Sequence, residues 1–340
     1  MHKKAYLSKS LSDDGVQCQT CEHFCAIKPG EAGECGVHRN IDGDLYLVVY
    51  GEAIAIHVDP IEKKPLFHFM PRSDALSIGT YGCNFRCPFC QNWQMSQRRG
   101  FDDQRDYVGQ QATPEVLVDI CRQKNASIIA YTYNEPTVFF EYTYDTAKLA
   151  HEHGIKNVYV SNGYMSRAAL DMIEPYLDGI NVDLKAFKKE FYRERCQARL
   201  EPVKRNIAHM ARETDIWVEV TTLLIPDLND SEEELQAMAE WMAGVNPDLV
   251  WHVTAFHPDY EMHDRPRTSQ RALARAYEIG KEAGLRYVYV GNVMDVDRES
   301  TYCPQCGEKL IQRHWYNVKE SWDERGVCPE CGQAIAGIWE

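Results

Sequence analysis

The residues with the clearest chemical potential are three cysteines in Cys83-Asn-Phe-Arg-Cys87-Pro-Phe-Cys90, with the spacing C-x3-C-x2-C. Three thiolates can hold three irons of a cubane [4Fe–4S] cluster. The fourth iron then keeps an open coordination position, which chemistry at a metal requires. The alternative is a zinc site with a distant fourth ligand. The triplet directly follows a predicted strand, and this position favours the cluster over zinc.

A second group of cysteines repeats the pattern Cys-Pro-x-Cys-Gly near the C-terminus. Each repeat places two thiolates on a tight turn, and two such turns make a tetrahedral site with four sulfur ligands. We therefore expect a structural zinc ribbon, with a single iron of the rubredoxin type as the alternative. The predicted ligands are Cys303, Cys306, Cys328 and Cys331.

A third group, near the N-terminus, has the less regular spacing C-x2-C-x3-C-x9-C. Four thiolates can close a zinc site or hold an auxiliary [4Fe–4S] cluster. His23 or His38 could replace one ligand, and an unligated cysteine-rich loop is the third alternative. The predicted ligands are Cys18, Cys21, Cys25 and Cys35.

The sequence contains 13 cysteines, and their grouping indicates metal binding rather than disulfides in a reducing compartment. Two of them stand outside the groups. Cys121 lies in the helical pattern PEVLVDICRQ, where a small apolar residue is expected to pack in the core. Cys196 lies in the charged stretch FYRERCQARL and receives no predicted role.

Strand-like runs alternate with amphipathic helical patterns between about residues 74 and 292. Repeated βα units predict a parallel sheet, either a barrel or a doubly wound sheet, in which ligands bind at the carboxyl ends of the strands. Short polar segments follow four of the predicted strands: YNEP, SNGY, DLK and IPDLND. The predicted strands are 75–82, 126–133, 157–162, 179–187, 217–225, 249–256 and, as a possible seventh, 287–292.

Composition and charge exclude several classes of protein. Lys and Arg number 37 against 51 Asp and Glu, and the net charge of −14 disfavours general nucleic-acid binding. The sequence contains no run of about 18 apolar residues, so no transmembrane helix is predicted. The N-terminus lacks the apolar core of a secretory signal, so we expect a cytoplasmic protein without membrane contact.

The cysteine triplet and the polar strand ends, in this order, resemble the radical S-adenosylmethionine (SAM) superfamily over about residues 75–292. Within it, YTYNEPTVFFEY, VYVSNGY, VDLKAF, AFHPDY and YVYVGN, with DPIEKKPLFHF before the triplet and CQNW at its third cysteine, resemble the pyruvate formate-lyase activating-enzyme-like branch. The most similar subgroup is the radical SAM enzyme of the AmmeMemoRadiSam system. The resemblance implies a [4Fe–4S] cluster whose open iron chelates SAM. One electron then cleaves SAM to a 5′-deoxyadenosyl radical that abstracts hydrogen from a substrate.

The resemblance also implies roles for residues around the SAM site. Phe89 matches the aromatic residue that lies by the adenine. Asn134 and Glu135 occupy the position of a GlyGlyGluPro motif, where Glu135 would accept a hydrogen bond from the methionine amino group. Tyr133 and Asn134 replace the glycine pair of that motif, so the carboxylate contact is the firmer expectation.

Further positions follow from the same resemblance. Asn162 and Asp183 end the third and fourth strands and would face the same pocket. Lys185 would pair with the SAM carboxylate, although an ordinary ion pair with Asp183 is the simpler reading of both residues. Pro226 and Asn229 follow the fifth strand, where the family approaches the adenine and ribose.

The predicted fold is α/β: a partial (β/α)6 radical SAM barrel with an N-terminal cysteine-bearing segment and a C-terminal zinc-ribbon or rubredoxin-like module. The predicted boundaries are 1–73 for the N-terminal segment, 74–298 for the barrel and 299–340 for the CPxCG ribbon. The predicted cofactors are the [4Fe–4S] cluster, SAM, zinc or iron in the ribbon, and zinc or an auxiliary cluster in the N-terminal segment.

The predicted function is reductive cleavage of SAM followed by hydrogen abstraction from an unidentified substrate. One alternative is an activating enzyme that acts on a glycine of a glycyl-radical enzyme. An alternative from another class is a non-catalytic, zinc-stabilised interaction protein, which the open site of the triplet disfavours because such a protein needs no incomplete cluster. The expected partners are a flavodoxin- or ferredoxin-type electron donor and a protein substrate or companion protein.

Overall fold

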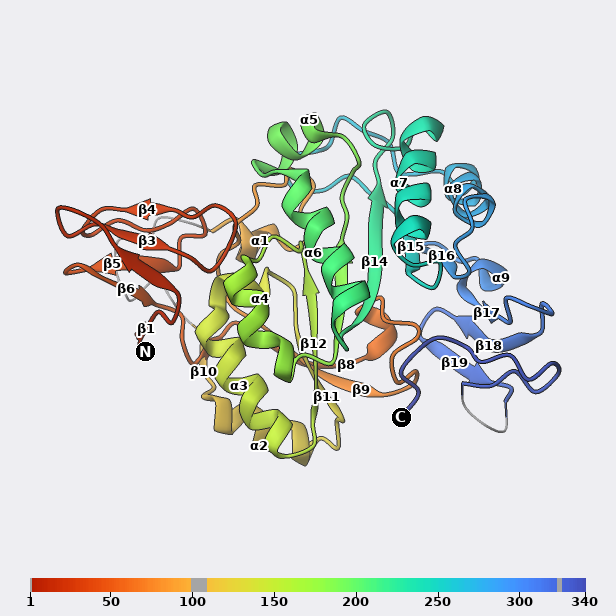
Figure 1. The fold of residues 1–340 in the computed structure, drawn as a ribbon, viewed down its shortest axis with the longest axis horizontal. Coiled ribbons are helices and arrows are strands. Elements are labelled where there is room, and N and C mark those ends of the chain that lie inside the picture. Colours follow the sequence, from red (N-terminus) through yellow and green to blue (C-terminus); the bar gives the residue numbers. More distant parts are fainter. Residues whose placement is uncertain (1, 99–108, 323–325) are drawn as a thin grey trace.

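The computed structural model describes residues 2–98, 109–322 and 326–340 (Figure 1). Its centre is a sheet in which these residues form eight strands, in the order β16-β15-β14-β13-β12-β11-β9-β8. Seven strands are parallel, and β8 pairs antiparallel with β9. The strands are β8 (Ala55–Pro60), β9 (Asp74–Gly79), β11 (Ile128–Tyr131), β12 (Lys156–Ser161), β13 (Gly179–Asp183), β14 (Trp217–Leu224), β15 (Val250–Ala255) and β16 (Val288–Gly291).

The parallel strands lie in the core of the protein. Every residue of β11 and β15 is buried, as expected for strands covered on both faces. This burial explains the nearly continuous β-branched and aromatic runs in the sequence. The predicted parallel strands, the seventh included, and the α/β fold class are confirmed. Within the described ranges, no helix is long and apolar enough to cross a membrane.

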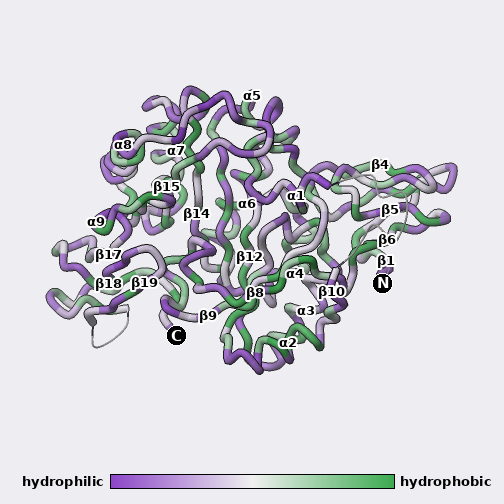
Figure 2. The backbone as a smooth tube through the Cα atoms, turned by 180° about the vertical axis from the view of Figure 1, so that it is seen from behind, coloured by the Kyte–Doolittle hydropathy of each residue, from purple (hydrophilic) through white to green (hydrophobic). Residues whose placement is uncertain are grey.

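The main helices follow the strands and pack against the sheet (Figure 1). Several begin at capping residues: the Ser231 side chain accepts from the backbone N–H of Glu234, and Thr113 caps the helix that contains Cys121. Both hydrophobic and hydrophilic stretches occur along that helix, α2 (Figure 2), and Cys121 is fully buried. The helices are α2 (Pro114–Gln123), α3 (Phe140–Glu152), α4 (Arg167–Ile173), α6 (Leu200–Glu213), α7 (Glu232–Val245) and α8 (Gln270–Glu282).

Short elements connect these units. The helices α1 (Trp93–Ser96) and α5 (Lys189–Phe191) lie in the loops after β9 and β13, and α9 (Val296–Glu299) leads out of the sheet. The strands β7 (Glu52–Ala53) and β10 (Gln110–Gln111) form a separate antiparallel pair.

The N-terminal residues form two small antiparallel sheets that project from one side of the sheet (Figure 1). They dock on the barrel after β12: Cys21 forms a β-bridge with Met165, and the Ser166 hydroxyl donates to the carbonyl of Gln19 at 2.6 Å. One sheet comprises β2 (Ser8–Ser10), β3 (Val16–Cys18) and β4 (Ala26–Ile27). The other comprises β1 (Lys3–Lys4), β6 (Asp44–Leu47) and β5 (His38–Ile41).

The C-terminal module is a three-stranded antiparallel sheet of β17 (Thr301–Tyr302), β18 (Lys309–His314) and β19 (Asn317–Glu320). The buried Arg313 fixes it to the segment before the barrel, because its guanidinium donates to the Phe67 carbonyl at 2.7 Å and lies 4.3 Å from the Phe67 ring. His68 is also fully buried there, between the Tyr289 hydroxyl and the Ala336 carbonyl, each at 2.6 Å.

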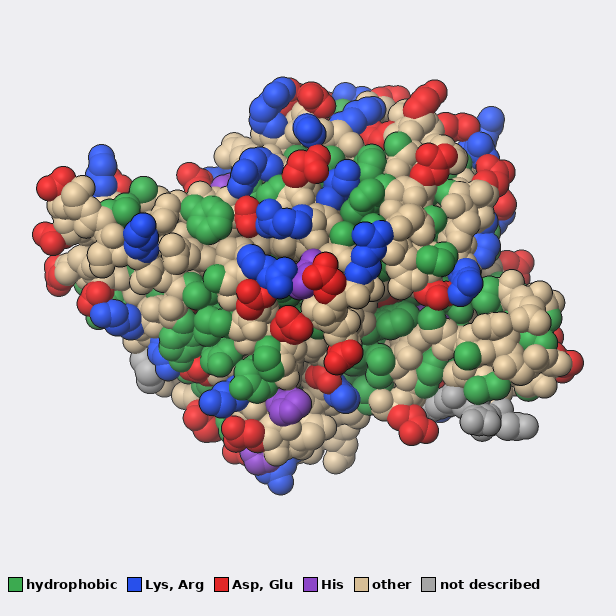
Figure 3. All heavy atoms as spheres, in the orientation of Figure 1, with side chains coloured by type: hydrophobic (Ala, Val, Ile, Leu, Met, Phe, Trp, Pro, Cys, Tyr) green, Lys and Arg blue, Asp and Glu red, His purple; other side chains and the backbone are tan. Residues whose placement is uncertain are grey.

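Two features of the whole molecule bear on the sequence predictions. The predicted boundary between residues 73 and 74 separates β8 from β9, which are neighbours in one sheet. Acidic and basic side chains are interspersed over the face seen in Figure 3. The net charge of −14 is therefore not gathered into one acidic surface on that face.

Candidate active site

A cavity of about 310 Å³ opens at the carboxyl ends of the parallel strands. That volume lies within the usual range for small-molecule sites. Residues after β9, β11, β12, β13 and β16 line it, together with side chains of β14 and β15. The lining includes nine of the residues predicted to bind the cluster or SAM: Cys83, Cys87, Cys90, Phe89, Asn134, Glu135, Asn162, Asp183 and Lys185.

The three cysteines lie on one ordered loop after β9. Cys83 and Cys87 are buried, and Cys90 is half-buried. Burial raises the pKa of the Cys83 and Cys90 thiols, and for Cys87 a hydrogen bond with Cys196 and then burial raise the pKa. These thiols therefore hold their protons until a metal displaces them. The described residues that line the cavity include no other cysteine. The donor set therefore fits a cubane held at three irons.

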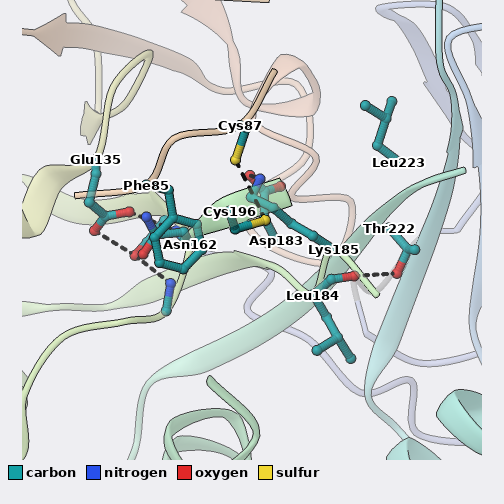
Figure 4. Close-up of polar contacts among 12 residues, drawn as sticks. Phe85, Cys87, Glu135, Asn162, Asp183, Leu184, Lys185, Cys196, Thr222 and Leu223 are labelled. Carbon is teal, nitrogen blue, oxygen red and sulfur yellow. Dashed lines mark hydrogen bonds and ion pairs between the residues drawn. The ribbon is translucent and has the colours of Figure 1, made fainter. Parts of the chain in front are cut away.

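Glu135 is buried beside the triplet, at the start of the turn after β11. Its Oε1 accepts hydrogen bonds from the Thr137 backbone (3.0 Å), the Thr137 hydroxyl (2.6 Å) and the Ser161 hydroxyl (2.9 Å). Within the part of the chain that the structure describes, its Oε2 accepts only the Asn162 backbone N–H, at 2.7 Å (Figure 4). Burial raises the pKa of Glu135, and these donors oppose that shift. Oε2 therefore has the remaining capacity to accept a ligand cation.

Asn134 braces the loop that carries the cysteines. Its side-chain oxygen accepts from the Thr80 backbone at 3.1 Å, and its amide nitrogen donates to the Gly82 carbonyl at 2.9 Å. The preceding Tyr133 has the left-handed φ of +70°, which is unusual for a residue with a side chain. The Tyr133 hydroxyl donates to Asp59 at 2.7 Å, and this bond holds the ring in place where the resembling motif has glycine.

Asn162 also uses its polar atoms inside the protein. Its amide nitrogen donates to the Asn84 side-chain oxygen at 2.7 Å, and its own oxygen accepts from the Tyr164 backbone at 3.0 Å. Asn84 stands between the first two cysteines of the triplet. The pair thus connects the cysteine loop to the end of β12.

Asp183 and Lys185 form the expected ion pair, with Nζ 3.0 Å from Oδ2, and both line the cavity (Figure 4). Lys185 Nζ also lies 5.9 Å from the centre of the Phe89 ring. Burial lowers the pKa of Lys185, but the Asp183 carboxylate more than offsets it, so the pKa lies well above its usual value. Lys185 is therefore a permanent cation beside the adenine-binding candidate Phe89.

Sequence reasoning missed Cys196. The residue ends a π-helical turn, Tyr192–Cys196, and its sulfur lies 3.8 Å from that of Cys87 (Figure 4). Its carbonyl also accepts the Arg86 backbone N–H at 3.0 Å. Pro226 and Asn229 differ from expectation because neither lines the cavity. The Asn229 amide instead donates to the Lys185 carbonyl at 2.6 Å and shapes the loop after β14.

The C-terminal quartet forms a compact group of sulfurs. The four ligand atoms lie within 4.8 Å of one another, with the pairs Cys303–Cys331 and Cys306–Cys328 both at 3.6 Å. Burial raises the pKa of Cys303, but the backbone N–H groups of Cys306 and Gln305 lower it further, to about 7. The geometry is consistent with the predicted zinc ribbon.

The N-terminal quartet lies at a separate, small cavity. Cys18 and Cys35 are buried, and Cys21 and Cys25 are half-buried. All four line this cavity, and Asn84 of the loop that carries the Cys83 triplet lines it as well. The structure thus brings the predicted members of each of the three cysteine groups together.

Comparisons with known proteins indicate the family of the chain. The model of the "Radical SAM superfamily" matches residues 77–242. The chain is 40% identical to the uncharacterized protein MJ0808 of Methanocaldococcus jannaschii over 98% of both chains. It is 27% identical to MJ1632 of the same organism, provisionally named a glycyl-radical enzyme activating enzyme, over 64% of this chain and 79% of that protein.

A similar fold occurs in a solved structure. The crystal structure of a radical SAM methyltransferase from Sphaerobacter thermophilus superposes with a TM-score of 0.51 and 18% identity, over 71% of each chain. This likeness concerns the fold. The triplet at the open cavity, the superfamily match and the shared architecture lead to one conclusion: the chain belongs to the radical SAM superfamily.

Proposed function

We propose that this protein reductively cleaves SAM and abstracts hydrogen from a substrate bound in the same cavity. The observation that carries the proposal is the convergence of three thiols of one loop with Glu135 and Lys185 at one cavity. When bound, a [4Fe–4S] cluster and SAM supply the one-electron cleavage and the 5′-deoxyadenosyl radical. Cys83, Cys87 and Cys90 are the residues that would hold the cluster.

The remaining residues bind and orient SAM. Glu135 Oε2 accepts from the methionine ammonium, since it has only one hydrogen bond among the described residues. Lys185 supplies the cation for the carboxylate, and the Phe89 ring beside it offers an apolar face to the adenine. Asn134 and Asn162 hold the cysteine loop and the β12 end in place.

The substrate lies toward the last strands of the sheet in this proposal. Thr221 and Leu223 of β14, Thr254 of β15 and Asn292 after β16 line that part of the cavity. The side chains are small or medium in size and mix hydroxyl, amide and apolar groups. Such a surface suits an uncharged polar group better than an anion, because these four side chains carry no positive charge.

The chain's place within the superfamily is part of the proposal. Its sequence motifs resemble those of the AmmeMemoRadiSam radical SAM enzymes in the activating-enzyme-like branch. A second candidate, activation of a glycyl-radical enzyme, is supported by the 27% identity to MJ1632. A flavodoxin- or ferredoxin-type protein is the proposed electron donor. A non-catalytic, zinc-stabilised module would use the ribbon but would leave the open cavity without a role.

One experiment tests the proposal directly. The protein is reconstituted anaerobically with iron and sulfide, reduced, and incubated with SAM, and 5′-deoxyadenosine is measured. We expect formation by the parent and by Cys121→Ala, in which a buried cysteine outside the cavity is removed. Cys87→Ala should form none. Equal formation by Cys87→Ala would refute the site, and a radical signal on an added glycine-containing partner would select the activating-enzyme candidate.

A further inference from the structure

The cysteines near the N-terminus converge on one cavity, although the first and the last are 17 positions apart in sequence. Thr20, His38, Asn84 and Thr137 complete much of its lining. The cavity is therefore shared between the N-terminal sheets and the barrel, and Asn84 belongs to the loop of the predicted SAM cluster.

The spacing of the sulfurs separates this group from the ribbon. A single tetrahedral zinc at about 2.3 Å from each sulfur draws four thiolates close together, as in the C-terminal quartet, whose ligand atoms lie within 4.8 Å of one another. Within residues 2–98, 109–322 and 326–340, neither the N-terminal quartet nor the Cys83 triplet forms such a group. A cubane cluster sits between its thiolates and holds them farther apart. The sulfurs of the N-terminal group are thus less closely packed than those of the ribbon, as a cubane requires.

A buried donor points to the same kind of ligand. The amide nitrogen of Asn84 is buried and has no hydrogen-bond partner, while its oxygen accepts from Asn162. Buried donors are nearly always satisfied, so this one indicates an acceptor that the protein itself does not supply. A thiolate or bridging sulfide of a cluster accepts such N–H groups. Asn84 is 2% exposed, which leaves water little access.

The two nearby histidines can be assigned by their contacts. The His23 ring bonds the Asn84 carbonyl at 2.8 Å and is not among the residues that line the cavity. His38 Nδ1 lies 3.9 Å from the Cys35 sulfur, and its Nε2 lies 3.0 Å from the buried Glu141 carboxylate. A histidine held in this way orients a ligand from behind rather than replacing it. The four cysteines are therefore the ligand set.

We propose that Cys18, Cys21, Cys25 and Cys35 bind a second [4Fe–4S] cluster, which delivers electrons to the cluster of the barrel. With four thiolates it has no open iron, so it suits electron transfer rather than SAM binding. The two sites are in direct contact through the chain: a Cβ on Gly82, which precedes Cys83, would lie 2.5 Å from the Cys35 carbonyl oxygen.

The electron-delivery role rests on the proposed function, whereas the metal site does not. A reduced flavodoxin- or ferredoxin-type protein loses one electron to the N-terminal cluster, which passes it to the oxidised barrel cluster. No covalent bond forms or breaks in the transfer. The donor protein ends one electron more oxidised, and the barrel cluster ends one electron more reduced.

Metal analysis of the parent tests the site without any substitution. We expect about eight irons and one zinc per chain after anaerobic purification and reconstitution. About four irons with two zincs would overturn the proposal, since both terminal groups would then hold single ions. About four irons with one zinc or less, after full reconstitution, would overturn it equally.

Two variants separate this proposal from the proposed function. Cys25→Ala should lose about four irons and keep its zinc, while SAM still perturbs the electron paramagnetic resonance spectrum of the remaining cluster. Cys87→Ala should also lose about four irons but should lose the SAM perturbation. If SAM perturbs neither cluster of the eight-iron parent, the proposed function fails and the second cluster stands. Unchanged iron in Cys25→Ala would refute the second cluster alone.

The relay is tested with two reductants. Cys25→Ala should form 5′-deoxyadenosine with a small chemical reductant such as dithionite at a rate close to that of the parent. With reduced flavodoxin the variant should be at least ten-fold slower than the parent. Equal slowing with both reductants would show that the N-terminal group only stabilises the catalytic loop. Equal rates of parent and variant with flavodoxin would refute the relay.

Discussion

The sulfur of Cys87 lies 3.8 Å from the sulfur of Cys196, which is fully buried and 109 positions away in the chain. Two sulfurs this close are too near each other to bind separate irons of one cubane. We therefore place Cys196 beside the cluster ligand Cys87 and not among the ligands. In the structure the Cys87 S–H donates to the Cys196 sulfur. Once Cys87 is a thiolate on iron it has no proton to give, and the Cys196 S–H becomes the donor. Hydrogen bonds to ligand sulfurs are a principal influence on the reduction potential of a cluster.

Removing the Cys196 thiol is therefore expected to lower the potential of the barrel cluster. One hydrogen bond of about 1 kcal/mol corresponds to a decrease on the order of 50 mV for a one-electron couple. Cys196→Ala should keep the iron content of the parent, and redox titration followed by electron paramagnetic resonance measures the shift. Cys121→Ala is the matched control, since that thiol is buried and donates to the Ala126 carbonyl. An unchanged potential would assign Cys196 to packing alone.

The second prediction concerns SAM anchoring. Glu135→Gln removes the charge that accepts from the methionine ammonium, a bond worth about 1.5–3 kcal/mol. SAM affinity should fall about ten- to hundred-fold, as measured by equilibrium dialysis of the reconstituted protein. The variant should also be less stable. In either orientation the NH2 group of the glutamine would face a backbone N–H that the carboxylate now accepts from, that of Asn162 or that of Thr137.

A control is available for Glu135→Gln. Glu234 is likewise buried and accepts the Phe187 backbone N–H at 2.7 Å, but it does not line the cavity. Glu234→Gln should lower stability and leave SAM affinity unchanged. Equal SAM affinity in Glu135→Gln and the parent would contradict the assignment of the YNEP segment.

The ribbon gives a third prediction. Its metal binds only the folded module, so the binding free energy contributes to folding. Cys328→Ala should release about one equivalent of zinc, or of iron if the site is of the rubredoxin type, and lower the thermal midpoint. The iron of the clusters should stay constant, as checked by metal analysis of the same samples. Loss of all iron together with zinc would show that the ribbon is required for barrel folding.

The fourth prediction is a pH dependence of stability. Burial lowers the pKa of His68 to about 4, below the unfolded value of about 6.5. The folded state therefore binds fewer protons than the unfolded state between these values. Stability is fully present above about pH 6.5 and falls as the pH drops toward 4. A shift of this size corresponds to about 3 kcal/mol.

Thermal unfolding followed at pH 7, 6, 5 and 4 measures this dependence. In His68→Met the contribution should vanish, so the midpoint should fall less steeply with pH than in the parent. His257→Gln changes an exposed histidine and should keep the parent's slope. If His68→Met and the parent show the same slope, another group carries the pH dependence.

Much of the site could be predicted because parallel strands bring their carboxyl ends to one edge. The polar segments after β11, β12 and β13 therefore lie beside the cysteine triplet, and Glu135, Asn162 and Lys185 line one cavity. Cys196 could not be predicted, because an irregular π-helical turn, with no repeating pattern in the sequence, positions its thiol. The unpartnered amide of Asn84 was also invisible, since its environment depends on the docked N-terminal sheets.

The edge of the sheet shows a second limit of the sequence. Ala55–Pro60 pairs with β9 from a segment predicted to lie outside the barrel. The segment is short, and its residues are mostly half-buried or exposed, so no run of apolar residues identifies it. Pairing with the buried neighbour β9, rather than its own composition, makes it a strand.

The docking of the N-terminal sheets has a consequence for biosynthesis. Gln19 leaves the ribosome long before Ser166, its hydrogen-bond partner 147 positions later. Domains generally fold as their residues emerge, but these cysteines must wait for a surface that has not yet been made. The docked form of the N-terminal sheets is therefore complete only after translation has passed residue 166.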